Sequence, residues 1–143
     1  MRRAILLAGL LATLPAAAFN FLSVAEPALL YDAPSQQGKP LFAIARGTPV
    51  EAVVMLDAWV KVRDADGDLA WIEKRLLSEK RMVIVKANRT QVRAHPGELA
   101  PIAFDAEGGV LLELLESGPI GWAKVRHRGG QLGYVRTTQV WGL

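Results

Sequence analysis

A repeat with a period of 63 residues constrains the fold of this chain more than any other feature. The tetrad Trp-Val-Lys-Val at Trp59–Val62 returns as Trp-Ala-Lys-Val at Trp122–Val125. Ten residues after the start of each tetrad a second one begins, Leu-Ala-Trp-Ile at Leu69–Ile72 and Leu-Gly-Tyr-Val at Leu132–Val135. Side chains of matching size class at matching spacing indicate a unit used twice. We therefore expect two small modules of similar structure.

The N-terminus has the pattern of a secretory signal peptide. Two arginines follow Met1, the apolar run Ala4–Leu14 comes next, and Pro15 precedes three alanines that end at Ala18. A basic region, an apolar region and small residues before a cleavage site are the three parts of such a signal. We predict cleavage after Ala18, so that residues 1–18 are the signal peptide and the mature protein is periplasmic or otherwise extracytoplasmic.

A retained membrane anchor is the alternative interpretation of this segment. The apolar run of 11 residues is shorter than the roughly 20 residues that a spanning helix needs. Phe19–Ala25 extends it only past the polar Asn20. We therefore expect no stable membrane span after cleavage of the signal.

The charge of the mature chain is small and unevenly distributed. Removal of Arg2 and Arg3 lowers the net charge from +3 to +1, which gives no reason to expect nucleic-acid binding. Residues 19–79 hold six basic and nine acidic residues, whereas residues 80–143 hold nine basic and five acidic ones. Solvated surfaces that happen to differ are the simplest explanation. Attraction between the modules, or an anionic partner of the second, are the alternatives.

The sequence offers no arrangement of catalytic or metal-binding residues. It has no cysteine, and no serine stands in a Gly-x-Ser-x-Gly motif. Asp64–Asp68 carries three alternating carboxylates, but a calcium loop needs Gly at its sixth position and Glu at its twelfth, where this chain has Leu69 and Arg75. A hairpin turn explains the segment more simply. We expect no enzyme activity, no metal and no cofactor.

Periodicity predicts an all-β chain. No window of a dozen residues carries a helical stripe, and Gly, Pro and Asp interrupt the apolar runs every 6 to 12 residues. We predict five short strands in each module and a 3-10 turn at the end of each, near Lys74–Leu77 and Thr137–Gln139. The predicted strands of the first module are Ala28–Tyr31, Leu41–Ile44, Val50–Leu56, Trp59–Arg63 and Leu69–Glu73. Those of the second are Thr90–Arg93, Ile102–Phe104, Val110–Leu115, Gly121–His127 and Leu132–Arg136.

The segment Ser78–Arg81 is the only candidate boundary between the modules, which places them at residues 19–79 and 80–143. Domains of about 60 residues bury only about 60% of their unfolded surface and are marginally stable alone. We therefore expect a monomer whose two domains pack against each other. The apolar run Met82–Val85 is the strand that we expect to be shared or buried at the junction.

Both modules resemble the bacterial SH3 (SH3b) domain. The matching motifs of the first are the start of a long loop at Ala28–Ser35, the beginning of the next hairpin at Gly47–Val50, the middle strand Trp59–Val62 and the closing strand Ala70–Ile72. Those of the second are Gln91–Pro96, Gly108–Val110, Trp122–Val125 and Gly133–Val135. The resemblance covers nearly all of residues 22–141 and implies two tandem, five-stranded SH3-like small barrels.

The resemblance also implies a function in the cell envelope. SH3b domains bind cell-wall peptidoglycan or peptides, commonly as accessories to a separate hydrolase. We therefore expect an exported, non-catalytic tandem module that recognises peptidoglycan, a peptide or an envelope protein partner. The alternative is a structural or assembly factor whose two domains pack together with closed grooves. A third possibility is an envelope hydrolase, but the sequence offers no arrangement of catalytic residues for it.

Two departures from the SH3 pattern bear on the ligand. The Pro and Tyr that proline-rich recognition uses are replaced by Glu73 and Leu76 in the first module. In the second module they are replaced by Arg136 and Gln139. Recognition of proline-rich peptides is therefore not expected.

Strand alternation points to a binding face in each module. It places Trp59, Lys61 and Arg63 on one face and Val60 and Val62 on the other, in the core. An aromatic side chain flanked by cations suits sugar rings and peptides. The alternative is a Trp that caps its barrel or fills the interface between the modules.

The second module repeats this pattern with a difference. Trp122, Lys124 and Arg126 match the first set, but Tyr31, the natural partner of Trp59, is matched by Arg93. We therefore expect the two grooves to bind different things. The predicted ligand-binding residues are Tyr31, Trp59, Lys61, Arg63, Trp122, Lys124 and Arg126.

Overall fold

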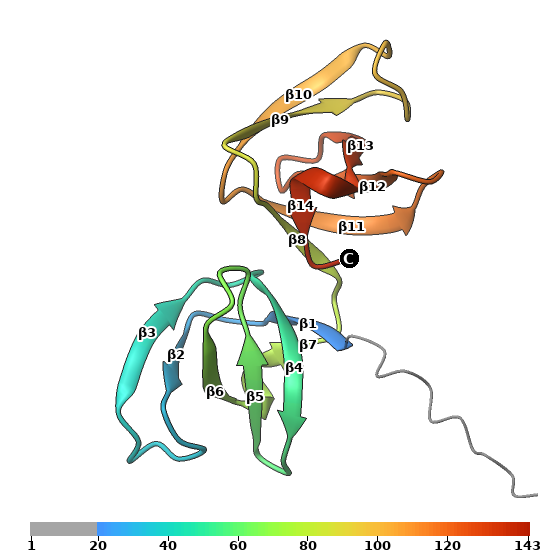
Figure 1. Cartoon of the computed structure of the whole chain (residues 1–143). Helices are drawn as coiled ribbons and strands as arrows, with labels where there is room; N and C mark the ends of the chain where they lie inside the picture. The colour runs from blue at the N-terminus through green and yellow to red at the C-terminus, as the bar shows by residue number, and fades with distance from the viewer. Residues whose placement is uncertain (1–19) are drawn as a thin grey trace, which may run out of the picture.

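The computed structural model describes residues 20–143, which form two antiparallel sheets of seven strands each (Figure 1). The first sheet contains β1 (Asn20–Val24), β2 (Ala28–Tyr31), β3 (Pro40–Ile44), β4 (Pro49–Met55), β5 (Trp59–Arg63), β6 (Leu69–Glu73) and β7 (Leu77–Ser78), with the 3-10 helix η1 (Lys74–Leu76) before β7. The second contains β8 (Met82–Val85), β9 (Arg89–Arg93), β10 (Ile102–Glu107), β11 (Leu111–Ser117), β12 (Trp122–Arg126), β13 (Leu132–Arg136) and β14 (Val140–Trp141), with η2 (Thr137–Gln139) before β14. The predicted signal peptide lies outside the described residues.

The two sheets have the same topology. Their strand orders are β3-β2-β6-β5-β4-β1-β7 and β10-β9-β13-β12-β11-β8-β14, so each strand of the second corresponds to the strand seven places earlier. Both sheets also have an irregular register at the same place, between Ala52 and Val54 in β4 and between Leu114 and Glu116 in β11. The prediction of an all-β chain built from one unit used twice is confirmed.

Each module has two strands besides the five predicted for its barrel, and one of them, β8, is the strand expected at Met82–Val85. β7 and β14 are only two residues long, too short to carry an alternating pattern. β1 directly follows the apolar N-terminal segment, so its sequence Asn-Phe-Leu-Ser-Val has no turn signal before it. It pairs with β4 on one side and β7 on the other. β1 thus lies between β4 and β7 and connects β7 to the rest of the first sheet.

The strands form because one face of each is apolar and buried. In β5, Val60 and Val62 are fully buried while Trp59, Lys61 and Arg63 lie on the outer face. β12 repeats this alternation with Ala123 and Val125 in the core. The two cores are separate clusters, one centred on residues such as Leu30 and Ile72 and the other on their counterparts Val92 and Val135.

The acidic segment between β5 and β6 is a hairpin turn held by its own first side chain. Asp64 Oδ1 accepts hydrogen bonds from the backbone N–H groups of Asp66 and Asp68, both at 2.9 Å. Gly67 has φ of 88°, a left-handed conformation that glycine adopts at little cost. Within residues 20–143 no group of three or more His, Cys, Asp or Glu side chains is placed to hold a metal ion.

The modules meet at β1, β8 and β14 (Figure 1). The Phe21 ring packs edge-on against the Trp141 ring, with 5.2 Å between centroids. The Arg81 guanidinium lies 5.7 Å from the Phe21 ring centroid and donates a hydrogen bond to the Gly142 carbonyl at 2.8 Å. Lys86 Nζ reaches the hairpin of the first module, 2.6 Å from the Ala65 carbonyl oxygen and 3.7 Å from Asp66 Oδ1. The two modules therefore contact each other through apolar and polar side chains.

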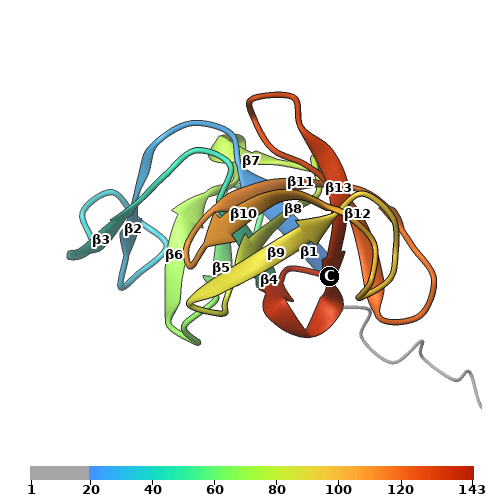
Figure 2. The ribbon, with the colours of Figure 1, turned by 90° about the horizontal axis from the view of Figure 1, so that it is seen from above.

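The strand β8 belongs to the second sheet alone. It pairs with β11 and β14. Of the two expectations for this strand, that it is shared between the modules or buried at the junction, the first is therefore wrong. Val83 and Val85 are buried in the second core, whereas Met82 and Ile84 are only half-buried on the opposite face. Seen from above, the second module lies over part of the first, and the β2–β3 hairpin extends beyond it (Figure 2). No helix in the described part of the chain is long and apolar enough to cross a membrane.

Candidate functional site

Each module carries a groove beside the Trp that opens its middle strand. In the first module Trp59 begins β5 directly after a tight turn, in which the Leu56 N–H donates to the Trp59 carbonyl at 2.8 Å. The indole is half-buried and borders a cavity of about 690 Å³. The residues that line this cavity are Pro34, Ser35, Gln36, Asp57, Ala58, Trp59, Glu73, Lys74 and Arg75. The groove thus lies between the long loop after β2 and the end of β6.

The structure brings Tyr31 and Trp59 together as the sequence predicts. Their rings meet edge to face, with centroids 5.7 Å apart and an interplanar angle of 85°. Such pairs are favoured by the positive edge of one ring over the negative face of the other. Tyr31 comes from the end of β2, next to β6, where it pairs in register with Trp71. The contact orients the Trp59 ring at one side of the groove.

A hydrogen bond closes the far side of this groove. Gln36 Nε2 in the long loop donates to Glu73 Oε1 at 2.6 Å, and Arg75 Nε donates to Glu73 Oε2 at 2.6 Å. The bond from Gln36 is the main cause of a pKa of the Glu73 carboxyl below its ordinary 4.5, partial burial opposes the shift, and Arg75 adds to it. Glu73 is therefore an ionised carboxylate at neutral pH.

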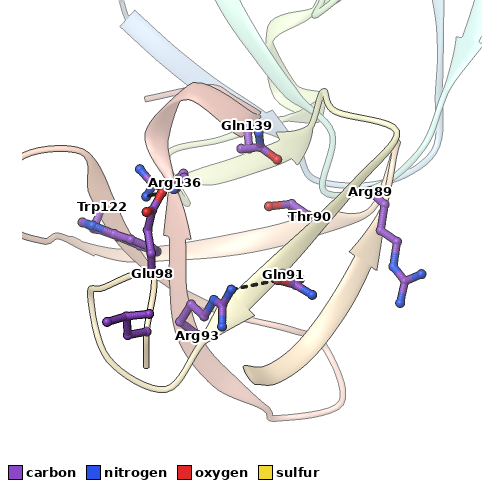
Figure 3. A pocket seen from close by; sticks show the side chains of 9 residues that line it. Arg89, Thr90, Gln91, Arg93, Glu98, Trp122, Arg136 and Gln139 are labelled. Carbon is purple, nitrogen blue, oxygen red and sulfur yellow. Dashed lines mark hydrogen bonds and ion pairs between the residues drawn. The ribbon is translucent and has the colours of Figure 1, made fainter. Parts of the chain in front are cut away.

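The second module has a groove at the equivalent place but of different chemistry (Figure 3). The cavity of about 730 Å³ is lined by Arg89, Thr90, Gln91, Arg93, Glu98, Leu99, Trp122, Arg136 and Gln139. The Arg136 guanidinium carbon lies 4.7 Å from the centroid of the Trp122 ring, a cation–π contact. Arg136 also forms an ion pair with Glu98. Three of these lining residues are arginines, whereas the first groove has only Arg75.

Five of the predicted binding residues line neither groove. Tyr31 reaches the first groove only through its contact with Trp59, and the other four are cations of β5 and β12. Lys61 and Lys124 follow the tryptophans by two residues, and successive residues on one face of a strand lie roughly 6.5 Å apart. Arg63 is farther along and pairs with Glu51 at 3.0 Å, and Arg126 pairs with Glu113 at 2.9 Å. They lie on the same face as the tryptophans but away from the cavity, and their role in binding stays a prediction.

The groove residues that strand alternation missed come from the long loops and the ends of the closing strands. They are Gln36, Glu73 and Arg75 in the first module and Arg93, Glu98 and Arg136 in the second. One signal for two of them is present in the sequence, since Glu73 and Arg136 stand where the SH3 pattern has a ligand-contacting residue. Nothing in the local pattern places the loop residues Gln36 and Glu98 against them.

The side-chain contacts described between the modules in residues 20–143 lie outside the linings of these two grooves. Phe21, Arg81, Lys86 and Trp141 make contacts at the junction, and none of these four borders the Trp59 or the Trp122 cavity. Each of the two grooves is built from residues of a single module.

Comparison with solved structures finds matches of low identity to longer proteins. NlpC2 from Trichomonas vaginalis is 13% identical, with a TM-score of 0.40, over 87% of this chain and 48% of that protein. NlpC1 from the same organism is 13% identical, with a TM-score of 0.40, over 86% of this chain and 45% of that protein. An NlpC/P60 family protein from Bacillus cereus is 16% identical, with a TM-score of 0.39, over 85% of this chain and 55% of that protein. The chain thus spans about half the length of these three structures.

Comparison by sequence identifies the family directly. No curated protein matches the chain. The bacterial SH3 domain matches it twice in tandem, over residues 24–79 and 86–142, which together are more than half of its length. Bacterial SH3 domains are binding modules. The chain therefore belongs to the bacterial SH3 domain family and contains two such domains.

Proposed function

We propose that this protein is an extracytoplasmic, non-catalytic module that binds peptidoglycan or a peptide of the cell envelope through the grooves at Trp59 and Trp122. The observation that carries the proposal is the repeated groove. Both modules place a half-exposed indole beside a long loop and the end of the closing strand, in a cavity that the rest of residues 20–143 leaves open. Membership of a family of binding modules supports the same function.

The chemistry of the grooves suits a ligand with both apolar and polar groups. An indole offers a flat apolar face for a sugar ring or a peptide side chain, while neighbouring amides and charges fix orientation. Gln36 and Glu73 supply these groups in the first module, and Arg93 and Arg136 supply them in the second. Peptidoglycan combines sugar rings with charged peptides, so it matches both kinds of contact.

Co-sedimentation of the full chain with purified peptidoglycan tests this function. We expect the wild-type protein to pellet with the sacculi and the double variant Trp59→Ala/Trp122→Ala to lose most of its retention. Loss of an aromatic contact of this kind costs on the order of 1–3 kcal/mol, which corresponds to a loss of about 5- to 150-fold in affinity. Circular dichroism and thermal unfolding of each variant check that the fold is intact.

Trp71→Ala is the matched control, because Trp71 lies on the outer face of β6 and lines neither Trp groove. It should retain wild-type binding. Equal retention of the folded double variant and the wild type would contradict binding through the two grooves.

The alternative is a structural factor whose two domains pack together with closed grooves. The contacts at Phe21, Arg81 and Trp141 support the packing of the domains, but they lie outside both Trp grooves. Quenching of Trp fluorescence by acrylamide separates the two functions. Strong protection of all four tryptophans in the free protein would favour the closed form. Accessible Trp59 and Trp122 are expected for the binding module.

A further inference from the structure

In both grooves a side chain of the long loop contacts a charged residue at the end of the closing strand. The charge of that strand residue is opposite in the two grooves. In the first module the neutral amide of Gln36 bonds to the carboxylate of Glu73. In the second module the carboxylate of Glu98 pairs with the guanidinium of Arg136. The strand residues are equivalent, because Trp59 pairs in register with Glu73 and Trp122 with Arg136. The second groove therefore presents a cation at the place where the first presents an anion.

Arg136 is held in an orientation that suits a carboxylate. Its guanidinium lies over the Trp122 ring at 4.7 Å from the centroid, which leaves the edge of the planar group available for hydrogen bonds. The side chain is 38% exposed, so the group is reachable from solvent. A guanidinium binds a carboxylate through two parallel N–H···O bonds, a geometry that neutral acceptors do not match.

A second arginine adds positive charge to the same groove. Arg93, on β9, donates to the Ala100 carbonyl at 2.9 Å and to Gln91 Oε1 at 2.8 Å, and both acceptors are neutral (Figure 3). Among the described residues no carboxylate forms an ion pair with it. Arg89, at the far end of the lining, points away from Trp122 and pairs with Asp105 at 2.9 Å. The part of the groove near Trp122 thus has two cations and only Glu98 to oppose them.

Glu98 is a weakly held counter-ion. It belongs to the exposed loop between β9 and β10, and its side chain is 72% exposed. Exposed ion pairs contribute little to stability because water solvates both partners well. A carboxylate from another molecule can therefore replace that of Glu98 at Arg136 at small cost.

We propose that the groove of the second module binds a carboxylate of a peptidoglycan stem peptide at Arg136, in the place that Glu98 occupies in the free protein. Trp122 contacts the adjoining apolar part of the peptide, and Arg93 strengthens the attraction. This inference rests on the proposed function and names the ligand group that the second groove recognises. The first groove, with Glu73 at the equivalent position, lacks this preference.

An NMR titration of the full chain tests the inference at the resonances of the Trp122 indole and the Arg136 side chain. The probes are an acidic stem tetrapeptide with free carboxylates and the same peptide with carboxamides in their place. We expect the wild-type protein to bind the free acid at least about fivefold more tightly, the effect of one charge-assisted hydrogen bond. Equal binding of the two peptides would overturn the proposal.

Charge variants separate Arg136 and Glu98 from the rest of the groove. Glu98→Gln should bind the free acid at least about threefold more tightly than the wild type, because the competing carboxylate is gone. Arg136→Gln should lose the preference for the free acid, and Arg136→Lys should keep only part of it. Glu116→Gln, the same change at an exposed residue of β11 that does not line this groove, should match the wild type. Weaker binding by Glu98→Gln would contradict the competition.

The result is distinguishable from that of the co-sedimentation experiment. Retention on sacculi without a preference for the free acid would leave the proposed function intact and refute this inference alone. A carboxylate preference without retention on sacculi would refute the proposed function and keep Arg136 as the anion site. A protein-type tetrapeptide of L-residues with the same carboxylates serves as a third probe, and tighter binding of it would overturn the assignment to the cell wall.

Discussion

Glu73 joins the long loop of the first module to the end of its closing strand. Its two carboxylate oxygens accept hydrogen bonds from Gln36 and Arg75, each at 2.6 Å. Because these bonds favour the ionised form, the pKa of Glu73 is below its ordinary value of 4.5. A carboxyl whose pKa is lower in the folded than in the unfolded protein stabilises the fold only while it is ionised.

The contribution of Glu73 should therefore depend on pH. It is fully present above pH 4.5, the ordinary value, and is lost as the pH falls through the lower value in the folded protein. We expect Glu73→Gln to be less stable than the wild type at pH 7 and this difference to shrink below pH 4.5. Urea denaturation at a series of pH values measures it. Glu79→Gln, which removes an exposed carboxylate near the junction, corrects for net charge, and a difference that stays constant down to pH 2 would contradict the prediction.

At the scale of the elements, the second module packs its closing strand more tightly than the first. Gly133 in β13 stands where β6 has Ala70. A Cβ at Gly133 would lie 2.5 Å from Val92 Cγ1 and 2.8 Å from the Arg93 carbonyl oxygen. No side chain fits there without movement of β9. The first module accommodates the Cβ of Ala70 at the equivalent position, whereas the second has no room for one.

Gly133→Ala should destabilise the protein, because the added methyl group overlaps Val92 and the backbone of β9. Overpacking of this kind costs about 1–3 kcal/mol. Chemical denaturation monitored by circular dichroism measures it. Gly97→Ala is the control, since a Cβ at Gly97 meets nothing within 4 Å and its φ is not positive. That variant should be as stable as the wild type or slightly more stable. Equal stability of the two variants would show that β9 and β13 can separate freely.

At the scale of the whole molecule, the contacts between the modules in residues 20–143 differ in strength. The Phe21–Trp141 pair is an aromatic contact, and pairs of this geometry contribute about 0.5–1.5 kcal/mol beyond their buried area. The Lys86–Asp66 ion pair is exposed, with 84% of the Asp66 side chain accessible, and contributes little. The aromatic pair should therefore determine how firmly the modules are held together.

Phe21→Ala should loosen the junction and expose Trp141. Acrylamide quenching of Trp141 fluorescence, in a background where Trp59, Trp71 and Trp122 are Phe, should increase at least about twofold, as expected for an indole that loses its partner ring. Leu22→Ala is the control, because Leu22 packs against the core of its own module on the opposite face of β1. Unchanged quenching in Phe21→Ala, or an equal increase in both variants, would show that the aromatic pair does not hold the junction.

Local pattern is sufficient for most of the strands of this protein. β2, β5, β6 and β13 begin and end where alternation predicts, because the residues that decide which face is buried are neighbours in the chain. The doubled spacing further implies that the second fold repeats the first. Alternation also identifies the outer faces of β5 and β12, and with them Trp59 and Trp122.

Only the tertiary structure decides what stands beside these tryptophans. Gln36 and Glu73 are 37 residues apart, and Glu98 and Arg136 are 38 apart, so no periodic signal connects them. They meet because the long loop of each module folds back over the end of its closing strand. The sequence by itself determined two similar folds with aromatic residues at equivalent places. The charge at the centre of each groove follows from non-local contacts, since side chains from distant segments meet only after the sheet has closed.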